Sequence, residues 1–151
     1  MTFSILVVCT ANICRSPAGE VMLASELQGR QVRVESAGTL ALNGNAVDST
    51  VSRLLEARGL DAMLSHRSKP IMPTMLGRYD LILCMENEHL EQVLRMYPMG
   101  RGKVRLMGHW SAAQVPDPVG KAEPVYAAAL EQIETSAKQW AQKLTNMGMI
   151  Q

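Results

Sequence analysis

The segment Val8–Pro17, VCTANICRSP, brings a cysteine, an arginine and a serine into one short stretch of chain. Cys9 ends an apolar run, Arg15 stands six positions later, and Ser16-Pro17 has the residue types that begin a helix. Backbone N–H groups in such a turn, together with a helix N-terminus, bind doubly charged oxyanions. The same groups stabilise a thiolate. The spacing therefore indicates phosphoryl transfer to the sulfur of Cys9.

Two side chains at the end of this segment suit the same chemistry. The guanidinium of Arg15 can bind two phosphoryl oxygens at once, and the Ser16 hydroxyl can donate to the cysteine sulfur. By itself Cys9 also fits a buried thiol at a strand end, but that interpretation does not explain the spacer, the arginine and the helix start. The predicted phosphate-binding loop contains Thr10, Ala11, Asn12, Ile13, Cys14, Arg15 and Ser16.

The departing oxygen of a phosphate ester needs a proton donor. Asp117 is the candidate, because it lies between two prolines in Val115–Lys121, VPDPVGK, where a stiff loop would hold its carboxyl group. An aspartate that hydrogen-bonds its own turn fits the same pattern. The residues alone leave both interpretations open.

The chain has three cysteines, which cannot all pair, so a secreted disulfide scaffold is excluded and a reducing cytoplasm is expected. Cys14 lies in the curled loop near Cys9. Oxidised Cys9 could condense with it to a reversible disulfide, although a small buried residue is the alternative. Cys84 sits in the middle of a strand pattern and is predicted to belong to the core.

The elements that must position these residues alternate between short apolar strands and helices. Strands are predicted at Ser4–Val8, Val32–Ser36, Asp80–Met85 and Val104–Met107. Helices are predicted from Ser16-Pro17 to Gly29, and over Val47–Arg58, Glu88–Met96 and Val125–Leu144. This alternation predicts an α/β fold, a four-stranded parallel sheet with helices on both faces, and ligand binding at the carboxyl ends of its strands.

Composition narrows the class of protein. The 151 residues fit one domain, residues 1–151, and 15 Lys+Arg against 14 Asp+Glu give a net charge of +1. This charge argues against binding to nucleic acid or to an anionic membrane surface. The apolar run near the N-terminus is too short for a signal peptide or a membrane span, so a soluble, cytoplasmic protein is expected. Metal-ligand spacing is absent, and no cofactor is expected.

Five segments resemble the low-molecular-weight protein tyrosine phosphatases. They are CTANICRSP from Cys9, VESAG from Val34, LSHRSKP from Leu64, YDLILCME from Tyr79 and VPDP from Val115. RGKVRLMGHW and SAKQWAQKL further resemble the bacterial branch associated with capsule and exopolysaccharide export. The resemblance implies the same four-stranded parallel sheet, in a three-layer sandwich.

The resemblance also implies roles for individual residues. Cys9 attacks phosphorus, and Asp117 first protonates the leaving oxygen and then activates water against the phosphocysteine. Asn12 holds the shape of the loop, with Ser36 and His66 as its supports. A phosphotyrosine protein is the implied substrate, in particular a bacterial tyrosine autokinase of polysaccharide export.

One position departs from the pattern of the family. Many relatives carry an aromatic residue directly after the Asp-Pro pair, where this chain has Val119. Leu40 or Leu42 is expected to form the opposite wall of the slot for the phenyl ring, so that the slot would be aliphatic. His89 and His109 show no comparable context and are predicted to be surface residues.

Two other functions share parts of this pattern. A thiol-dependent arsenate reductase has the same fold and loop, but it needs a further resolving pair of cysteines, which Cys84 alone cannot supply. A cysteine phosphocarrier must keep its phosphocysteine, so Arg15 and Asp117 would be superfluous in it.

Overall fold

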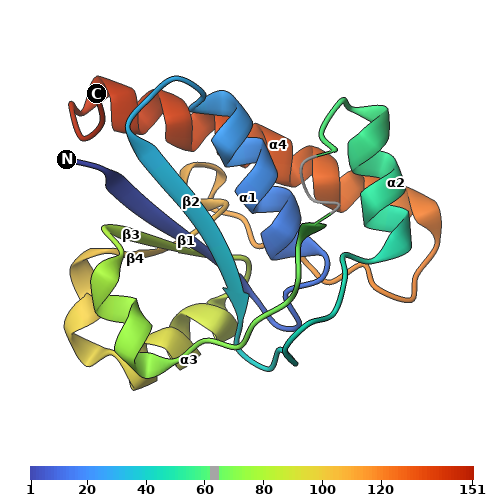
Figure 1. The fold of residues 1–151 in the computed structure, drawn as a ribbon, viewed down its shortest axis with the longest axis horizontal. Helices are drawn as coiled ribbons and strands as arrows, with labels where there is room; N and C mark the ends of the chain where they lie inside the picture. The colour runs from blue at the N-terminus through green and yellow to red at the C-terminus, as the bar shows by residue number, and fades with distance from the viewer. Residues whose placement is uncertain (62–64) are drawn as a thin grey trace.

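The computed structural model describes residues 1–61 and 65–151, and it shows one four-stranded sheet (Figure 1). Its strands are β1 (Phe3–Cys9), β2 (Val32–Gly38), β3 (Leu81–Cys84) and β4 (Val104–Leu106). Their order is β2-β1-β3-β4, and every neighbouring pair is parallel. The predicted four-stranded parallel sheet is therefore confirmed. Leu64, the first residue of LSHRSKP, lies outside the described residues.

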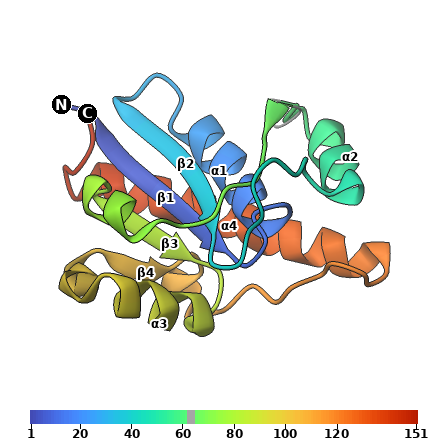
Figure 2. The same ribbon diagram turned by 60° about the horizontal axis from the view of Figure 1, so that its bottom comes forward.

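Helices cover both faces of the sheet, as Figure 2 shows. The α-helices are α1 (Arg15–Glu26), α2 (Ser49–Ala57), α3 (Asn87–Met96) and α4 (Glu123–Asn146). Short 3-10 helices are η2 (Pro73–Arg78), η3 (Pro98–Gly102) and η4 (His109–Ser111). Helices α1, α2 and α4 share one core cluster with the sheet, whereas α3 and η2 share the other.

Strand β1 contributes to both clusters because its side chains alternate between the two faces. Ile5 and Val7 pack under α1 and α4, and Leu6 and Val8 pack under α3 and η2. All four are fully buried. An apolar run covered on both sides is what a central strand of a parallel sheet requires, and it fixes where the strand releases Cys9.

The structure shifts the predicted element ends by a few residues, for local reasons. Strand β2 continues to Gly38 because Ala37 and Gly38 stay paired with the end of β1. A Cβ at Gly38 would lie 2.3 Å from the carbonyl oxygen of Thr10, so only glycine allows this close approach. Helix α2 begins two residues later than expected because the Asp48 side chain caps it.

None of the helices within residues 1–61 and 65–151 combines the length and the apolar character needed to cross a membrane.

Candidate active site

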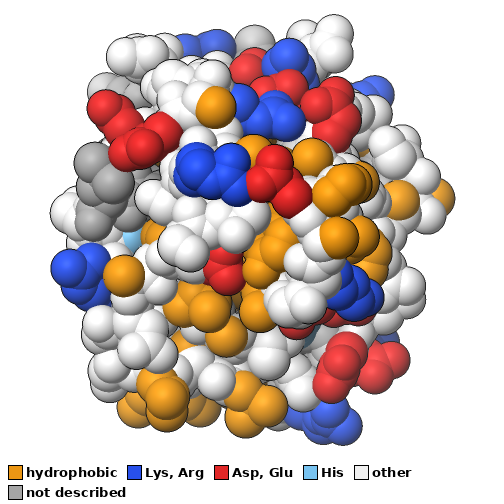
Figure 3. Space-filling model, turned by 90° about the vertical axis from the view of Figure 1, so that its right-hand side faces the viewer, with side chains coloured by type: hydrophobic (Ala, Val, Ile, Leu, Met, Phe, Trp, Pro, Cys, Tyr) orange, Lys and Arg blue, Asp and Glu red, His pale blue; other side chains and the backbone are white. Residues whose placement is uncertain are grey.

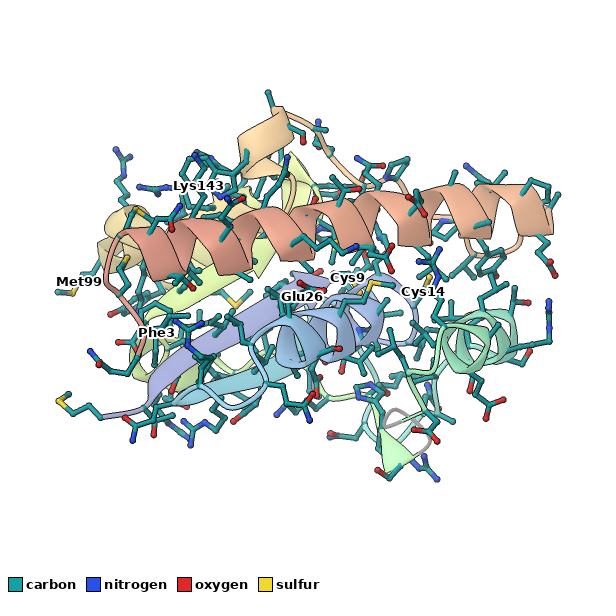
Figure 4. All side chains as sticks on the ribbon, turned by 90° about the horizontal axis from the view of Figure 1, so that it is seen from above. Phe3, Cys9, Cys14, Glu26, Met99 and Lys143 are labelled. Atoms are coloured by element: carbon teal, nitrogen blue, oxygen red, sulfur yellow. The ribbon has the colours of Figure 1, made fainter. Side chains whose placement is uncertain are left out.

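The segment Cys9–Ser16, here called the nucleophile loop, connects the end of β1 to the start of α1. Cys9 is the last residue of β1, and Cys14 immediately precedes α1. Figure 4 shows both cysteines at this end of α1. The loop therefore lies at the carboxyl edge of the sheet and enters a helix N-terminus, as the sequence predicts.

The sulfur of Cys9 is held by Ser16. The Ser16 hydroxyl lies 3.0 Å from Sγ, and the Ser16 backbone N–H donates to the same sulfur at 3.4 Å. Asn12 Nδ2 donates to Ser16 Oγ at 2.7 Å, which leaves the hydroxyl proton free to point at the sulfur. Ser16 thus acts as a donor, and a donor stabilises the thiolate form of Cys9.

Asn12 determines the shape of the loop. It is fully buried and has φ = 58°, a left-handed conformation that asparagine tolerates better than most residues. Its Nδ2 also donates to Ser36 Oγ at 3.0 Å, and its Oδ1 accepts from the Lys69 N–H at 3.0 Å. His66 Nε2 lies 2.9 Å from its backbone oxygen. The structure brings Ser36 and His66 to Asn12, as expected, and adds Lys69.

A glutamate that the sequence analysis missed extends this network. Ser36 Oγ donates to Glu20 Oε1 at 2.5 Å. Burial raises the pKa of Glu20, although its hydrogen bond from Ser36 opposes that shift. Glu20 lies on the second turn of α1. Its position shortly after the helix start at Ser16-Pro17 was the only sequence signal that it lies near the nucleophile loop.

The backbone of the loop offers donors for an anion. The N–H groups of residues 10–14 have no acceptor within the described part of the chain. Consecutive free amides next to a helix N-terminus can together bind an anion such as a phosphoryl group.

Arg15 closes the loop on its other side. It is 2% exposed, and its Nη1 donates to Glu86 Oε1 at 2.5 Å and to the Val115 carbonyl at 2.8 Å. Contacts within the described residues engage only Nη1, so Nε and Nη2 remain to bind phosphoryl oxygens. Glu86 is a second residue that the sequence did not single out. It follows the end of β3, and this position indicates that it lies at the carboxyl edge of the sheet, where Cys9 also lies.

His89 corrects the sequence analysis, which predicted a surface residue. It is 1% exposed and lies in the first turn of α3. Its Nδ1 accepts from the Glu86 N–H at 3.1 Å, so Nε2 carries the proton and donates to Thr10 Oγ1 at 2.8 Å. Burial, followed by the charge of Arg15, lowers the pKa of His89 and favours this neutral form. His109 is exposed, as predicted.

The segment Val115–Lys121, here called the acid loop, carries Asp117. The Val115 N–H donates to the Met85 carbonyl at 2.9 Å, which fixes the start of this loop beside β3. Asp117 is exposed, and its Oδ1 accepts from the Val119 N–H at 3.0 Å. This contact is the turn contact considered from the sequence, and it occupies one carboxyl oxygen.

Cys9, Arg15 and the free amides thus share the carboxyl edge of a parallel sheet, and Arg15 contacts the start of the loop that carries Asp117. The sequence profile of the family described as "Low molecular weight phosphotyrosine protein phosphatase" matches residues 4–148. The chain belongs to this family. Members of the family hydrolyse phosphotyrosine through a phosphocysteine intermediate, and the chain is therefore a protein-tyrosine phosphatase.

Individual relatives are similar over almost the whole phosphatase. The low molecular weight protein-tyrosine-phosphatase Wzb of Escherichia coli strain K12 is 42% identical over 142 residues, covering 93% of this chain and 95% of that protein. The crystal structure of the tyrosine phosphatase Wzb from Escherichia coli K30 in complex with sulphate is 39% identical, with a TM-score of 0.89. That match covers 95% of this chain and 99% of the other.

An arginine phosphatase shares the fold. The structure of YwlE from Geobacillus stearothermophilus is 28% identical, with a TM-score of 0.88 and coverage of 97% and 96%. The tyrosine phosphatase matches confirm the family expected from the sequence and support its capsule and exopolysaccharide branch.

The three aliphatic side chains that the sequence predicts at the walls of the slot are exposed. Leu40 is 75% exposed, Leu42 is 72% exposed and Val119 is 41% exposed. The Leu40 N–H donates to the Thr10 carbonyl at 2.9 Å, which places this segment beside the nucleophile loop. Figure 3 shows hydrophobic side chains gathered on the face seen from the right-hand side of Figure 1, with charged side chains around them.

The other two cysteines of the phosphatase are both buried thiols. Burial raises the pKa of Cys14, and the neighbouring Cys9 raises it further. Burial alone raises the pKa of Cys84, whose side chain is fully buried in β3. The predicted core position of Cys84 is confirmed.

Proposed function

We propose that Cys9, Arg15 and Asp117 perform the hydrolysis within one phosphatase domain, residues 1–151, which works in the cytoplasm without a cofactor. The single observation that carries the proposal is the arrangement around the sulfur. Asn12 fixes Ser16 as a donor to Cys9, and free amides follow in the same loop. This arrangement stabilises a nucleophilic thiolate and binds the phosphoryl group that it attacks.

In the first step, the Cys9 thiolate attacks phosphorus and the bond from phosphorus to the phenolic oxygen breaks. Asp117 transfers its proton to that oxygen, so that a neutral phenol leaves. Loop residues Thr10–Ser16 bind the transferred phosphoryl group. Among them, the guanidinium of Arg15 binds two of its oxygens and neutralises their charge.

In the second step, water attacks the phosphocysteine. Asp117, now ionised, accepts a proton from that water, and the bond between sulfur and phosphorus breaks. Cys9 leaves as a thiolate, which the Ser16 hydroxyl again stabilises. Inorganic phosphate is released, and Asp117 holds the proton for the next cycle.

For the substrate, we propose phosphotyrosine on a bacterial tyrosine autokinase of polysaccharide export. The similarity to Wzb supports this class of partner, and the rim residues Leu40, Leu42 and Val119 provide apolar surface for a phenyl ring. A guanidinium leaving group, as expected for an arginine phosphatase, would gain little from such a rim.

The test is a panel of substrates offered to the purified protein at mildly acidic to neutral pH. A phosphotyrosine peptide from the autokinase, phosphoarginine, arsenate with a thiol reductant, and a phosphorylated sugar-carrier protein are compared. We expect turnover of the peptide to exceed that of phosphoarginine at least about tenfold in kcat/KM. Preference for phosphoarginine, reduction of arsenate, or a phosphocysteine that is passed on without hydrolysis would overturn the proposal.

We further propose that Cys14 protects Cys9 during oxidation. Peroxide converts the Cys9 thiolate to a sulfenic acid, and Cys14 then attacks it to form a disulfide with release of water. The support for this step is their place in one short loop, since Cys9 ends β1 and Cys14 immediately precedes α1. Mass spectrometry after mild peroxide treatment should find the Cys9–Cys14 disulfide. Overoxidation of Cys9 with Cys14 still reduced would remove the claim.

A further inference from the structure

The hydroxyl group of Tyr126 joins the acid loop to the opposite side of the site. Tyr126 lies in the first turn of α4 and is 5% exposed. Its oxygen accepts a hydrogen bond from the Gly120 N–H at 3.3 Å. Its proton is donated to Asp48 Oδ2 at 3.2 Å. One hydroxyl group therefore donates one hydrogen bond and accepts another, and so connects two loops.

Asp48 is itself firmly placed. Its Oδ1 caps α2 by accepting from the N–H groups of Thr50 at 2.9 Å and Val51 at 3.2 Å. Its own N–H donates to the carbonyl of Ile13 at 2.8 Å. The backbone of Asp48 is thus hydrogen-bonded to the nucleophile loop. The Tyr126 hydroxyl then connects the Asp48 side chain to Gly120 of the acid loop.

The position of the contact on the acid loop matters for Asp117. Gly120 lies three residues after the aspartate and has φ = +83°, and a hydrogen bond from Lys121 N to Pro118 O at 3.0 Å closes the turn there. Asp117 also accepts from Val119 within the same turn. Any displacement of Gly120 therefore moves the turn that carries the carboxyl group.

The two ends of the acid loop are held differently. Val115 is held by the Met85 carbonyl and by Arg15, whereas Gly120 is held by Tyr126. We propose that Tyr126 is a positioning residue for the general acid, because its hydroxyl fixes the turn of Asp117 relative to the nucleophile loop. This inference rests on the proposed role of Asp117. It assigns to Tyr126 a function in the first chemical step rather than in stability alone.

The test is Tyr126→Phe, which removes only the oxygen and keeps the buried ring. kcat/KM is measured with phenyl phosphate, whose leaving group needs protonation, and with p-nitrophenyl phosphate, whose leaving group does not. We expect kcat/KM to fall about fivefold to tenfold for phenyl phosphate, and less than about twofold for p-nitrophenyl phosphate. A purely structural role would lower both values equally.

Two controls separate the possible outcomes. Tyr79→Phe removes another buried tyrosine hydroxyl, which donates to Glu35 Oε1 at 2.8 Å, and it should change both substrates alike. In an Asp117→Ala background, Tyr126→Phe should have no further effect on phenyl phosphate.

The inference is overturned if Tyr126→Phe alters the two substrates equally while Asp117→Ala distinguishes them. If Asp117→Ala itself fails to distinguish them, the assignment of the acid in the proposed function is wrong, and the inference is overturned with it.

Discussion

The nucleophile loop and the acid loop supply the two halves of one reaction, but they are built in opposite ways. The first is largely buried, and β2, the segment near Lys69, and α3 all contribute side chains or backbone groups to it. The second is largely exposed, and its Asp117 contacts its own turn. A nest for an anion must exist before the substrate binds, because its amides have to point inward together. A proton donor needs only to reach one oxygen of the substrate, so fewer contacts are enough to hold the loop that carries it.

The largest effect is expected in the buried loop. Cys9→Ser should lower kcat by at least about 10³-fold, since an alcohol at this position is a far weaker nucleophile than the thiolate. The matched control is Cys84→Ala, a buried thiol on β3, which should retain activity within about threefold. Steady-state assays on an aryl phosphate decide this. Full activity of Cys9→Ser would remove the proposed mechanism.

The next largest effect is expected in the exposed loop. Asp117→Ala should lower kcat/KM for phenyl phosphate by about 10²-fold to 10³-fold, and that for p-nitrophenyl phosphate by about tenfold or less. Asp117→Asn keeps a side chain that can accept from Val119 but has no acidic proton, so it should be as slow as the alanine variant. If the asparagine variant remains fast, the carboxyl group serves the turn and not the proton transfer.

Asn12 tests how far the buried loop depends on its supports. Asn12→Ala and Asn12→Gly both remove the donors to Ser16 and Ser36, so we expect each to lower kcat/KM about tenfold to 100-fold. Alanine at φ = 58° should also lower the free energy of unfolding by about 1 kcal/mol more than glycine. Denaturant titration separates these contributions. Equal kinetics for the wild type and Asn12→Gly would show that backbone shape alone matters.

A smaller effect is expected at the rim. Val119→Tyr adds a ring beside the slot, and it should lower KM for phosphotyrosine peptides about twofold to tenfold, corresponding to about 0.5–1.5 kcal/mol of stacking. Val119→Leu enlarges the side chain without a ring and serves as the control. An unchanged KM in the tyrosine variant would place this residue outside the slot.

The smallest effect concerns pH and His89. Its pKa is lowered in the folded protein, so the unfolded chain gains a proton first as pH falls below about 6.5. The contribution of neutral His89 to stability is therefore present above that pH and is lost as pH falls toward the lowered pKa. His89→Gln lacks this titration, so its Tm should fall less than that of the wild type between pH 7 and pH 5. Parallel Tm curves would contradict this assignment.

Local patterns were enough to predict much of the fold. The apolar β1, the helix start at Ser16-Pro17 and the run around β3 follow from residue type and spacing, and all three elements are present. The ends of β2 and α2 were missed by up to two residues, because pairing with β1 and the Asp48 cap decide them. These are contacts between or beyond the elements, which periodicity does not register.

The candidate site divides in the same way. A cysteine, a spacer and an arginine lie within one segment, so their chemistry could be inferred from their order along the chain. Glu86 and His89 come from a distant segment, and only the parallel sheet brings the end of β3 next to the end of β1. His89 was predicted at the surface because an isolated histidine in a polar helix start gives no sign of what covers it.

The sequence by itself determined that one short loop could bind a phosphoryl group and attack it, because those groups are neighbours in the chain. The tertiary structure decided how each group is held. It buried Arg15 against Glu86, made Ser16 a donor through Asn12, and connected the turn of Asp117 to Asp48 through Tyr126. Such contacts join residues far apart along the chain, and only packing of the completed sheet and its helices brings them within hydrogen-bonding distance.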